Sequence, residues 1–228
     1  YAIALRLVGS EMCIRDSPFV GGDSQDEGLP YFSIRYKRFS VEGLDAGLDL
    51  FKNDNSVFGL LLTPRFYEVK SSFADDGELN VIDTTHRTVF AGVSYQYQHA
   101  LFQVAANALK DVGGESDGTE ANLTVSRGFN WRDFTIAPSL GLVWQDGRLV
   151  EHFYGVADDE TAPGRPAYGE HSSLNYQAAL TGIWTPGKHW HLLAVVKEDY
   201  LGEGITDSPI IDERSLTSVA VGAVFYFW

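Results

Sequence analysis

The chain has almost no cysteine and no long apolar run. Its 228 residues contain one cysteine, Cys13, and one methionine, Met12. A single thiol excludes a disulfide scaffold and a cysteine-ligated zinc site. No stretch of about 18 consecutive apolar residues occurs, which excludes a membrane-spanning helix. Neither absence excludes a transmembrane β-barrel, because the strands of such a barrel are apolar on only one face.

Basic residues are also scarce. Lys and Arg together number 17 against 31 Asp and Glu, which gives a formal net charge of −14. Nucleic-acid-binding domains are usually basic, so this balance argues against a nucleic-acid partner. The length corresponds to one domain. Aromatic residues, in contrast, make up 13% of the chain.

The two rare residues lie in one segment, Leu7–Ser17, which reads LVGSEMCIRDS. In a single reading frame this segment matches the translation of an adapter used in sequencing libraries. We therefore expect residues 1–17 to be a non-native leader and residues 18–228 to form the domain. On this interpretation the first native strand and the signal peptide have been lost by truncation.

The last segment, Leu216–Trp228, has the sequence LTSVAVGAVFYFW and alternates strictly. Side chains of a strand point to opposite faces in turn, so Thr217, Val219 and Val221 share one face and Ser218 and Ala220 share the other. A soluble protein rarely leaves aromatic residues at a frayed end. An outer-membrane barrel places aromatic girdles at the membrane interfaces, so this ending is typical of one.

Further segments alternate with the same period of two, and none shows a convincing helical period apart from a short turn at Glu151–Val156. The alternating segments are Phe32–Lys37, Phe58–Phe66, Thr88–Tyr97, Phe102–Asn107, Glu120–Ser126, Phe134–Gln145, Ser173–Trp184 and Trp190–Asp199.

The connections between these strands are short and long in strict alternation. Short ones lie near Gln98–Ala100, Gly128–Arg132 and Thr185–Lys188, and long polar ones at Lys70–Asp83, Asp111–Gly118, Gln145–Ser172 and Gly202–Glu213. Outer-membrane barrels have short periplasmic turns and long outer loops. A soluble all-β sandwich is the alternative, but it does not explain this asymmetry. The pattern predicts localisation in the outer membrane of a Gram-negative cell.

We predict an all-β, antiparallel transmembrane β-barrel of about ten strands. This number treats Leu29–Leu50 as one long, bulged strand, followed by eight strands from Phe58 onward, and adds the lost first strand. Twelve is the alternative if Leu29–Leu50 divides and one further strand exists. Tyr1–Val8 alternates well enough to occupy the vacant edge.

The same alternation assigns side chains to the lumen and to the membrane interface. Aromatic residues near the short turns and the end of the chain should form an interfacial girdle: Trp131, Trp184, Trp190, Phe225 and Phe227. Charged residues on the opposite face are lumen candidates: Arg35, Lys37, Arg65, Glu120, Lys197 and Asp199. They form either ion pairs that plug a narrow barrel or a selectivity lining for small solutes. For ten strands the plug is favoured.

No arrangement of residues points to an enzyme. Gly114–Gly118 reads GESDG and fits the pattern around a hydrolase nucleophile at Ser116, but it lies in an acidic loop with no helix after it. His189 and His191 share one strand face without a nearby third ligand. The acidic runs Asp75–Asp76 and Asp158–Glu160 lack the spacing of a calcium loop. We therefore predict no catalytic residue, no metal site and no cofactor.

Several segments resemble the MipA/OmpV family of outer-membrane proteins. The resemblance runs from about Pro18 to the end of the chain and includes SPFVGGD at Ser17–Asp23 and LPYFSIRYKRF at Leu29–Phe39. Its most specific parts are two loop motifs, one formed by Phe153, Tyr154, Gly155 and Val156 and the other containing Ser208 and Pro209. The final Trp228 departs from the aromatic-x-Phe ending that is usual in the family.

The resemblance implies an outer-membrane barrel of Gram-negative bacteria. One member of the family is regarded as a scaffold that joins a lytic transglycosylase to a murein synthase. Others are described as porin-like or as surface adhesion proteins. The expected function is therefore an envelope scaffold for murein enzymes, with a small-solute channel or a surface interaction barrel as the alternative. The expected surroundings are outer-membrane lipid and lipopolysaccharide.

Overall fold

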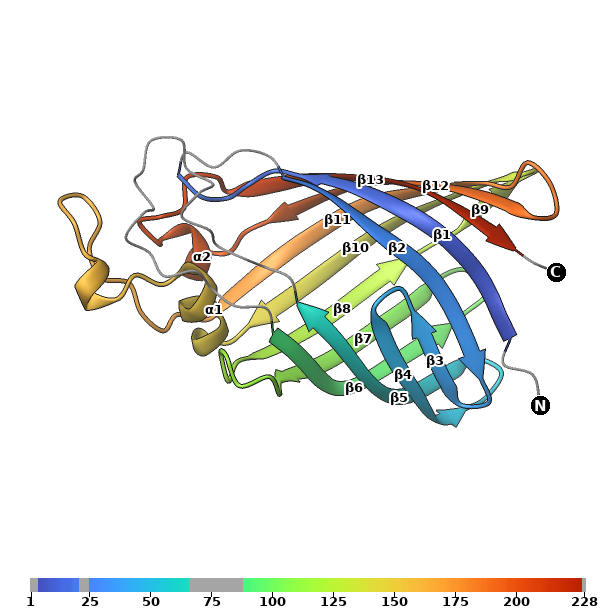
Figure 1. Ribbon diagram of the computed structural model, residues 1–228, viewed down its shortest axis with the longest axis horizontal. Coiled ribbons are helices and arrows are strands. Elements are labelled where there is room, and N and C mark those ends of the chain that lie inside the picture. The colour runs from blue at the N-terminus through green and yellow to red at the C-terminus, as the bar shows by residue number, and fades with distance from the viewer. Residues whose placement is uncertain (1–3, 21–24, 66–87, 227–228) are drawn as a thin grey trace.

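The computed structural model describes residues 4–20, 25–65 and 88–226. In these residues thirteen strands form one antiparallel sheet that closes on itself (Figure 1). The strands are β1 (Ala4–Arg15), β2 (Gln25–Tyr36), β3 (Phe39–Glu42), β4 (Asp45–Lys52), β5 (Ser56–Arg65), β6 (Thr88–Gln98), β7 (Gln103–Asp111), β8 (Thr119–Ser126), β9 (Phe129–Trp131), β10 (Phe134–Gln145), β11 (Ser173–Trp184), β12 (Trp190–Tyr200) and β13 (Ser215–Tyr226).

Closure comes from the pairing of β13 with β1, so the sheet has no free edge between the two ends of the chain. Strand β9 continues the line of β8, because both pair with β10, at Phe134–Ile136 and Ser139–Gln145 respectively. The described wall thus consists of twelve strand positions. The expectation of an all-β transmembrane barrel is confirmed, with the higher of the two strand numbers.

The prediction that Leu29–Leu50 forms a single long strand was wrong. This stretch contains the end of β2, all of β3 and most of β4. Two tight turns divide it, and each has a residue with positive φ, Lys37 at 54° and Gly43 at 60°. Glycine adopts this conformation readily, but lysine does so at a cost. The Gly43 turn therefore had a sequence signal, and the Lys37 turn had almost none.

Strand β1 lies within the segment that we interpret as a non-native leader. It pairs with β13 from Leu7 to Arg15 and with β2 from Ala4 to Arg15, with a register shift after Leu5. These backbone hydrogen bonds close the barrel whatever the origin of the segment. The division into a leader at 1–17 and a domain at 18–228 stays a prediction.

In the described part of the chain, the helical segments and the long connections after β7, β10 and β12 lie at one end of the barrel, and the start of β1 and the end of β13 lie at the other (Figure 1). The helical segments are α1 (Gly147–Tyr154), η2 (Asp158–Glu160) and α2 (Glu203–Thr206). Short periplasmic turns and long outer loops orient the barrel, so the helical end is the outer end. The predicted long loop at Lys70–Asp83 lies outside the described residues. No described helix is long and apolar enough to cross a membrane.

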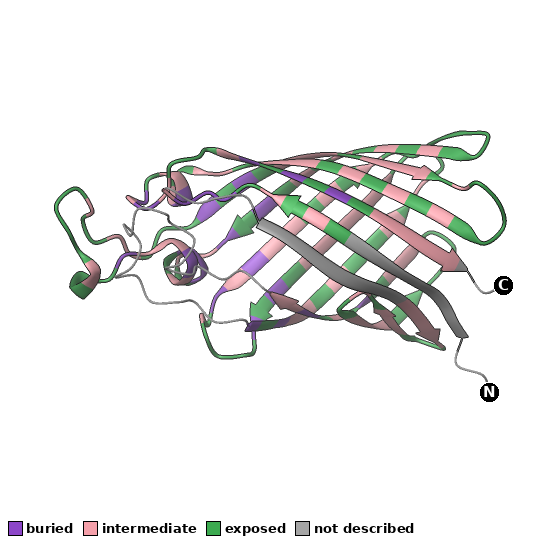
Figure 2. Ribbon diagram, turned by 45° about the horizontal axis from the view of Figure 1, so that its top comes forward, coloured by how far each residue is buried: buried purple, intermediate pink, exposed green. Residues whose placement is uncertain are grey.

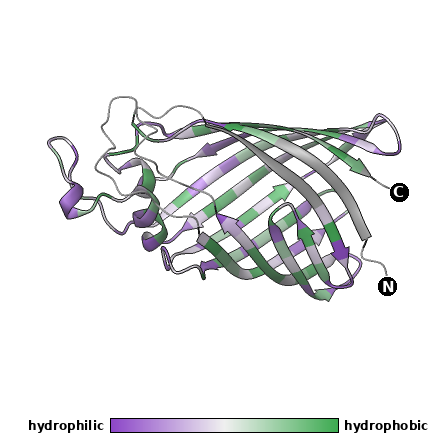
Figure 3. Cartoon of the chain, in the orientation of Figure 1, coloured by the Kyte–Doolittle hydropathy of each residue, from purple (hydrophilic) through white to green (hydrophobic). Residues whose placement is uncertain are grey.

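Side chains alternate between the lumen and the lipid along the long strands whose side chains are described (Figures 2 and 3). In β10, Leu140 is 70% exposed, whereas its lumen-facing neighbours Ser139 and Gly141 are only partly exposed. In β13 the exposed residues Val219 and Val221 alternate with the buried residues Ser218 and Ala220. The apolar faces lie outside because lipid, not a protein core, covers them.

The assignment of Leu140 to the lipid-facing side of β10 makes a testable prediction. A lysine placed there must hold its ammonium group in hydrocarbon, so we expect Leu140→Lys to lower the free energy of unfolding by roughly 2–4 kcal/mol. Unfolding by denaturant in lipid vesicles measures the change. The control is Ser139→Lys, one residue earlier and facing the lumen, which should cost clearly less. Equal losses in the two variants would refute the assignment of faces.

The hairpin of β3 and β4 is short, so the described pairing on both of its sides is short as well. Strand β2 pairs with β3 from Ser33 to Tyr36, while residues 25–32 pair with β1. On the other side of the hairpin, the pairing of β5 with β4 extends to Leu62.

Candidate functional site

The outer end of the lumen is filled by helix α1. Asp146 begins this helix by accepting a hydrogen bond from the backbone N–H of Leu149 through Oδ1, at 2.9 Å. Its apolar side chains Leu149, Val150 and Phe153 are buried. Leu149 and Phe153 pack against Phe90 and Leu109, which project inward from β6 and β7. The helix therefore folds back onto the inner wall.

A second apolar cluster joins three outer segments around the end of α1. Phe19, Val156 and Ile210 are buried together, with Tyr154 and Tyr168 against them. They come from the segment after β1, the segment after α1 and the segment after α2. The cluster holds these segments to one another over the mouth of the barrel.

The two loop motifs identified in the sequence meet in this region. The Ser208 hydroxyl donates a hydrogen bond to the carbonyl oxygen of Tyr154 at 2.6 Å. Gly155 ends α1 where a Cβ would lie 2.3 Å from the carbonyl oxygen of Glu151, so only glycine fits there. Phe153 and Val156 are buried in the two clusters, and Pro209 follows Ser208 directly. These residues thus hold the outer segments in place.

Tyr168 fixes the same region to α2. Its hydroxyl donates to the carbonyl oxygen of Gly204 at 2.9 Å, and its ring stacks on His171 with centroids 4.7 Å apart. Burial, and secondly the charge of Asp207, raise the pKa of the Tyr168 phenol. The phenol therefore stays protonated and keeps donating at any pH that a cell envelope meets.

Below α1 the lumen holds a cavity of about 370 Å³, here called the upper cavity. Tyr154 lies at its outer end, and polar side chains from the wall line the rest. Four of the six lumen candidates, Arg65, Glu120, Lys197 and Asp199, come together here. The further polar lining residues are Arg15, Asn107, Asn122, Thr124, Gln145, Asn175 and Gln177.

A hydrogen-bonded network runs around one wall of this cavity. Arg65 Nη2 lies 2.5 Å from Glu120 Oε1, and the Glu120 side chain is only 7% exposed. The same oxygen accepts from the amide of Asn122 at 2.8 Å, and Glu120 Oε2 accepts from Gln145 at 3.5 Å. Gln145 in turn accepts from Asn175 at 3.1 Å. Ionised groups taken out of water need such partners.

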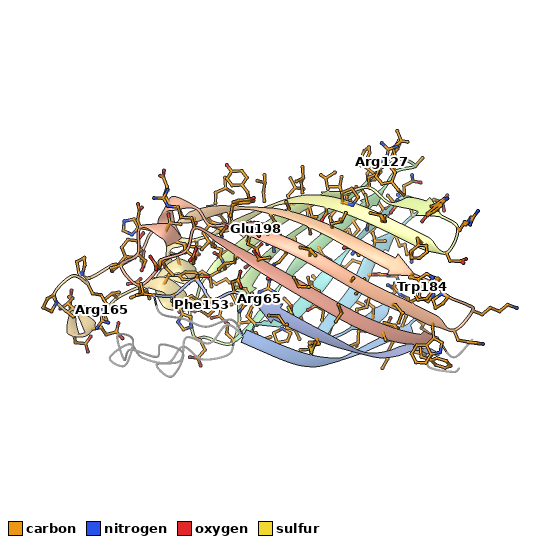
Figure 4. The ribbon with its side chains drawn as sticks, turned by 90° about the horizontal axis from the view of Figure 1, so that it is seen from above. Arg65, Arg127, Phe153, Arg165, Trp184 and Glu198 are labelled. Carbon is orange, nitrogen blue, oxygen red and sulfur yellow. The ribbon has the colours of Figure 1, made fainter. Side chains whose placement is uncertain are left out.

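On the adjoining part of the wall, Lys197 Nζ lies 2.6 Å from Asp199 Oδ2. The other carboxylate oxygen, Asp199 Oδ1, is buried and has no hydrogen-bond partner among the described residues. Figure 4 labels Arg65 and Phe153, which lie toward the outer end of the barrel.

The other two lumen candidates lie elsewhere. Arg35 lies in the periplasmic half, in a second cavity of about 420 Å³, the lower cavity. Its guanidinium bridges Asp49 and Glu42, each at 3.3 Å, and so ties the β3–β4 hairpin to β2. Lys37 is exposed in the turn after β2, with Nζ 5.3 Å from the centre of the Tyr36 ring. The unforeseen turn is the reason why Lys37 does not reach the lumen.

The girdle candidates in the described part of the chain lie at the periplasmic end. Trp131 is 70% exposed at the end of β9, and Trp184 stacks on Phe134 with centroids 5.8 Å apart. Trp190 meets the ring of Phe225 edge-on at 5.1 Å. Phe227 lies outside the described residues. Trp184 is labelled in Figure 4 near the end opposite Phe153.

The GESDG motif has a structural explanation. The carboxylate of Asp111 accepts hydrogen bonds from the backbone N–H groups of Gly113 at 2.8 Å and Ser116 at 2.6 Å, and from the Ser116 hydroxyl at 2.8 Å. The Thr88 hydroxyl donates to it as well. Ser116 therefore stabilises the loop between β7 and β8 around Asp111.

Charge is distributed unequally between the two ends. The short turns carry five exposed basic residues, here called the basic rim: Lys37, Arg38, Arg127, Arg132 and Lys188. The same turns contain only two acidic residues, Asp54 and Asp133. Arg127 and Arg132 lie over the rings of Phe129 and Trp131, at 4.9 and 5.6 Å from the centroids.

The sequence reasoning missed the plug formed by α1 and the basic rim. The plug had a weak signal, since Leu149, Val150 and Phe153 fit a helical period. Its partners Phe90 and Leu109 are apolar residues on strand faces that should be polar in a water-filled lumen. The rim could have been found by adding up charge over the short turns alone.

A family model described as "MltA-interacting protein MipA" matches residues 9–227. The "Putative outer membrane protein YiaT" of Escherichia coli K12 is 24% identical over 221 residues, which cover 96% of this chain and 90% of that protein. The "MltA-interacting protein" of the same organism is 20% identical over 223 residues, which cover 96% and 89%.

Among solved structures, the NanC porin is similar with a TM-score of 0.51 at 10% identity, and the match covers 96% of this chain and 100% of that one. This likeness concerns the fold. The family model and the two relatives are described as an interacting protein and as an outer-membrane protein, not as enzymes. Together with the closed barrel, they identify a protein of the outer membrane.

Proposed function

This chain belongs to the MipA family of outer-membrane barrels, and from that membership we propose that it is a scaffold whose periplasmic end binds murein enzymes. The name of the relative from Escherichia coli, "MltA-interacting protein", supports a protein partner for this family. No enzymatic step is assigned to the barrel itself.

The observation that carries the proposal is the basic rim. Short turns offer little area for a partner, so contact alone would bind weakly. Five exposed cations on an otherwise acidic chain add electrostatic attraction toward an acidic surface. Aromatic rings beneath Arg127 and Arg132 hold two of these cations at the edge of the membrane.

Reversing the rim charge tests this proposal. In the variant Lys37→Glu, Arg38→Glu, Arg127→Glu and Arg132→Glu, we expect the refolded barrel to bind a purified lytic transglycosylase or murein synthase of the same envelope at least tenfold more weakly. Binding of the unaltered barrel should weaken as salt rises from 50 to 300 mM, because exposed charges are screened. Surface-plasmon resonance in lipid nanodiscs measures both effects.

The matched control reverses acidic charge at the outer end, with Asp158→Lys and Asp159→Lys at exposed positions of the η2 segment. This variant should bind the enzymes as the unaltered barrel does. A rim variant with unchanged affinity would refute the proposal, and so would an equal loss in the control.

A small-solute channel is the second candidate function. It is favoured by the two polar cavities and by charged side chains that line them. The plug formed by α1 opposes it, since Leu149 and Phe153 lie against the wall with almost no exposure. Conductance across a planar bilayer separates the two functions.

A further inference from the structure

One wall of the upper cavity presents a row of neighbouring side chains from four strands. The register brings together Thr124 of β8, Gly141 of β10, Gln177 of β11 and Asp199 of β12. Each residue is paired with the next across the sheet, and all point to the lumen face. We call these four residues the polar shelf.

Two members of the polar shelf carry polar groups that no other described residue engages. Among the described residues, neither the Thr124 hydroxyl nor the Gln177 amide has a hydrogen-bond partner, although both line the cavity. Between them Gly141 leaves a hollow. A Cβ on Gly141 would lie 3.2 Å from Gln177 Oε1 and 3.3 Å from Thr124 Oγ1.

The fourth member adds a buried acceptor. Asp199 Oδ1 receives no hydrogen bond among the described residues, while Oδ2 is paired with Lys197. A buried carboxylate oxygen without a donor is costly, so a ligand that donates there gains more than an ordinary hydrogen bond. The shelf offers a hydroxyl, an amide with both donor and acceptor atoms, and a carboxylate, and the neighbouring Lys197 adds an ammonium group.

This set of groups fits a ligand that both donates and accepts hydrogen bonds at several adjacent positions. The neighbouring hydroxyl groups of a sugar ring do this. A fully ionised phosphate has no hydrogen to donate to the unpaired oxygen Asp199 Oδ1, and an apolar ligand would leave every polar group of the shelf unpaired. The cavity volume of about 370 Å³ lies within the range of small-ligand pockets, roughly 300–1,000 Å³.

We propose that the upper cavity binds a polyhydroxylated sugar ring, held by Thr124, Gln177, Asp199 and Lys197 over the hollow at Gly141. This inference does not depend on the binding of murein enzymes, which concerns the other end of the barrel. The sugar is either free in solution or the headgroup of a glycolipid in the outer leaflet.

The test uses the full chain refolded in phosphatidylcholine nanodiscs, with thermal unfolding as the readout. The probes are maltose, dodecyl maltoside, which carries the same disaccharide on an alkyl chain, and dodecylphosphocholine, which has the chain without the sugar. Saturable binding to the folded state raises the melting temperature. We expect dodecyl maltoside to raise it saturably and dodecylphosphocholine not to do so.

Maltose distinguishes the sources. A saturable rise with maltose as well assigns the site to sugars that arrive through water, and a rise with dodecyl maltoside alone assigns it to a headgroup that arrives from the bilayer. If neither maltose compound raises the melting temperature, or if dodecylphosphocholine matches dodecyl maltoside, the proposal is overturned.

Two matched variants locate the effect. Gln177→Leu removes a shelf amide and should raise the half-saturating probe concentration at least tenfold, whereas Gln96→Leu makes the same exchange in the lower cavity and should leave it unchanged. Gly141→Ala fills the hollow without removing a polar group and should act like Gln177→Leu. Equal responses of Gln177→Leu and Gln96→Leu would overturn the assignment to the shelf.

Discussion

A barrel that carries Leu149→Asn and Phe153→Asn should conduct ions in discrete steps across a planar bilayer, and the unaltered barrel should be silent. Both side chains are buried against Phe90 and Leu109 of the inner wall. Truncating a buried Phe or Leu costs roughly 2–5 kcal/mol. A helix of eight residues is marginal on its own, so losing this packing should release α1 from the inner wall even though Ser208 still holds its last residue, Tyr154.

The control for this experiment is Val112→Asn, which makes a similar apolar-to-amide exchange at an exposed position of the loop between β7 and β8. It should stay silent. If the double variant folds, as judged by its circular dichroism, and still does not conduct, then α1 is not what closes the lumen. If the unaltered barrel already conducts in reproducible steps, the channel function takes precedence over the scaffold.

A silent barrel would also bear on the scaffold function. The described outer segments are tied together by the cluster of Phe19, Val156 and Ile210, and α1 packs on the inner wall beneath them. If the unaltered barrel does not conduct, a partner at the basic rim binds a barrel with a closed lumen, and scaffolding in the periplasm carries no cost in permeability.

Much of this fold is predictable from period-two alternation, because one side of each strand must face lipid. Leu140 and Leu180 lie on the lipid side, and Ser139 and Gly141 on the lumen side, as their spacing requires. The division of Leu29–Leu50 was not predictable to the same extent. A turn at Lys37 has a conformation that sequence patterns rarely assign to lysine.

The candidate site depends on register, which the sequence does not encode locally. Arg65 and Glu120 are 55 residues apart, and their contact requires the pairing of β5 through β8 to be known. The polar shelf is a row across four strands, and a shift of one residue in any of them would turn a member to the lipid face. The plug likewise joins α1 to strands that precede it by some 40–60 residues.

Breaking the ion pair between Arg65 and Glu120 should lower the stability of the barrel more than breaking any other lumen contact among the described residues. The two groups lie 2.5 Å apart, and the carboxylate is 93% buried, since its side chain is 7% exposed. In Arg65→Met the carboxylate keeps only the amides of Asn122 and Gln145 as partners. We expect the free energy of unfolding to fall by about 3–5 kcal/mol, the usual cost of leaving one buried charge unpaired.

A double-mutant cycle distinguishes this account from a loss of packing. The Arg65 guanidinium lies 5.7 Å from the centre of the Phe90 ring, so methionine at position 65 retains much of the apolar contact. In Arg65→Met with Glu120→Gln no charge is left unpaired, and most of the lost stability should return. Unfolding by denaturant in lipid vesicles supplies all four values. Simple additivity of the two single losses would mean that Glu120 does not depend on Arg65.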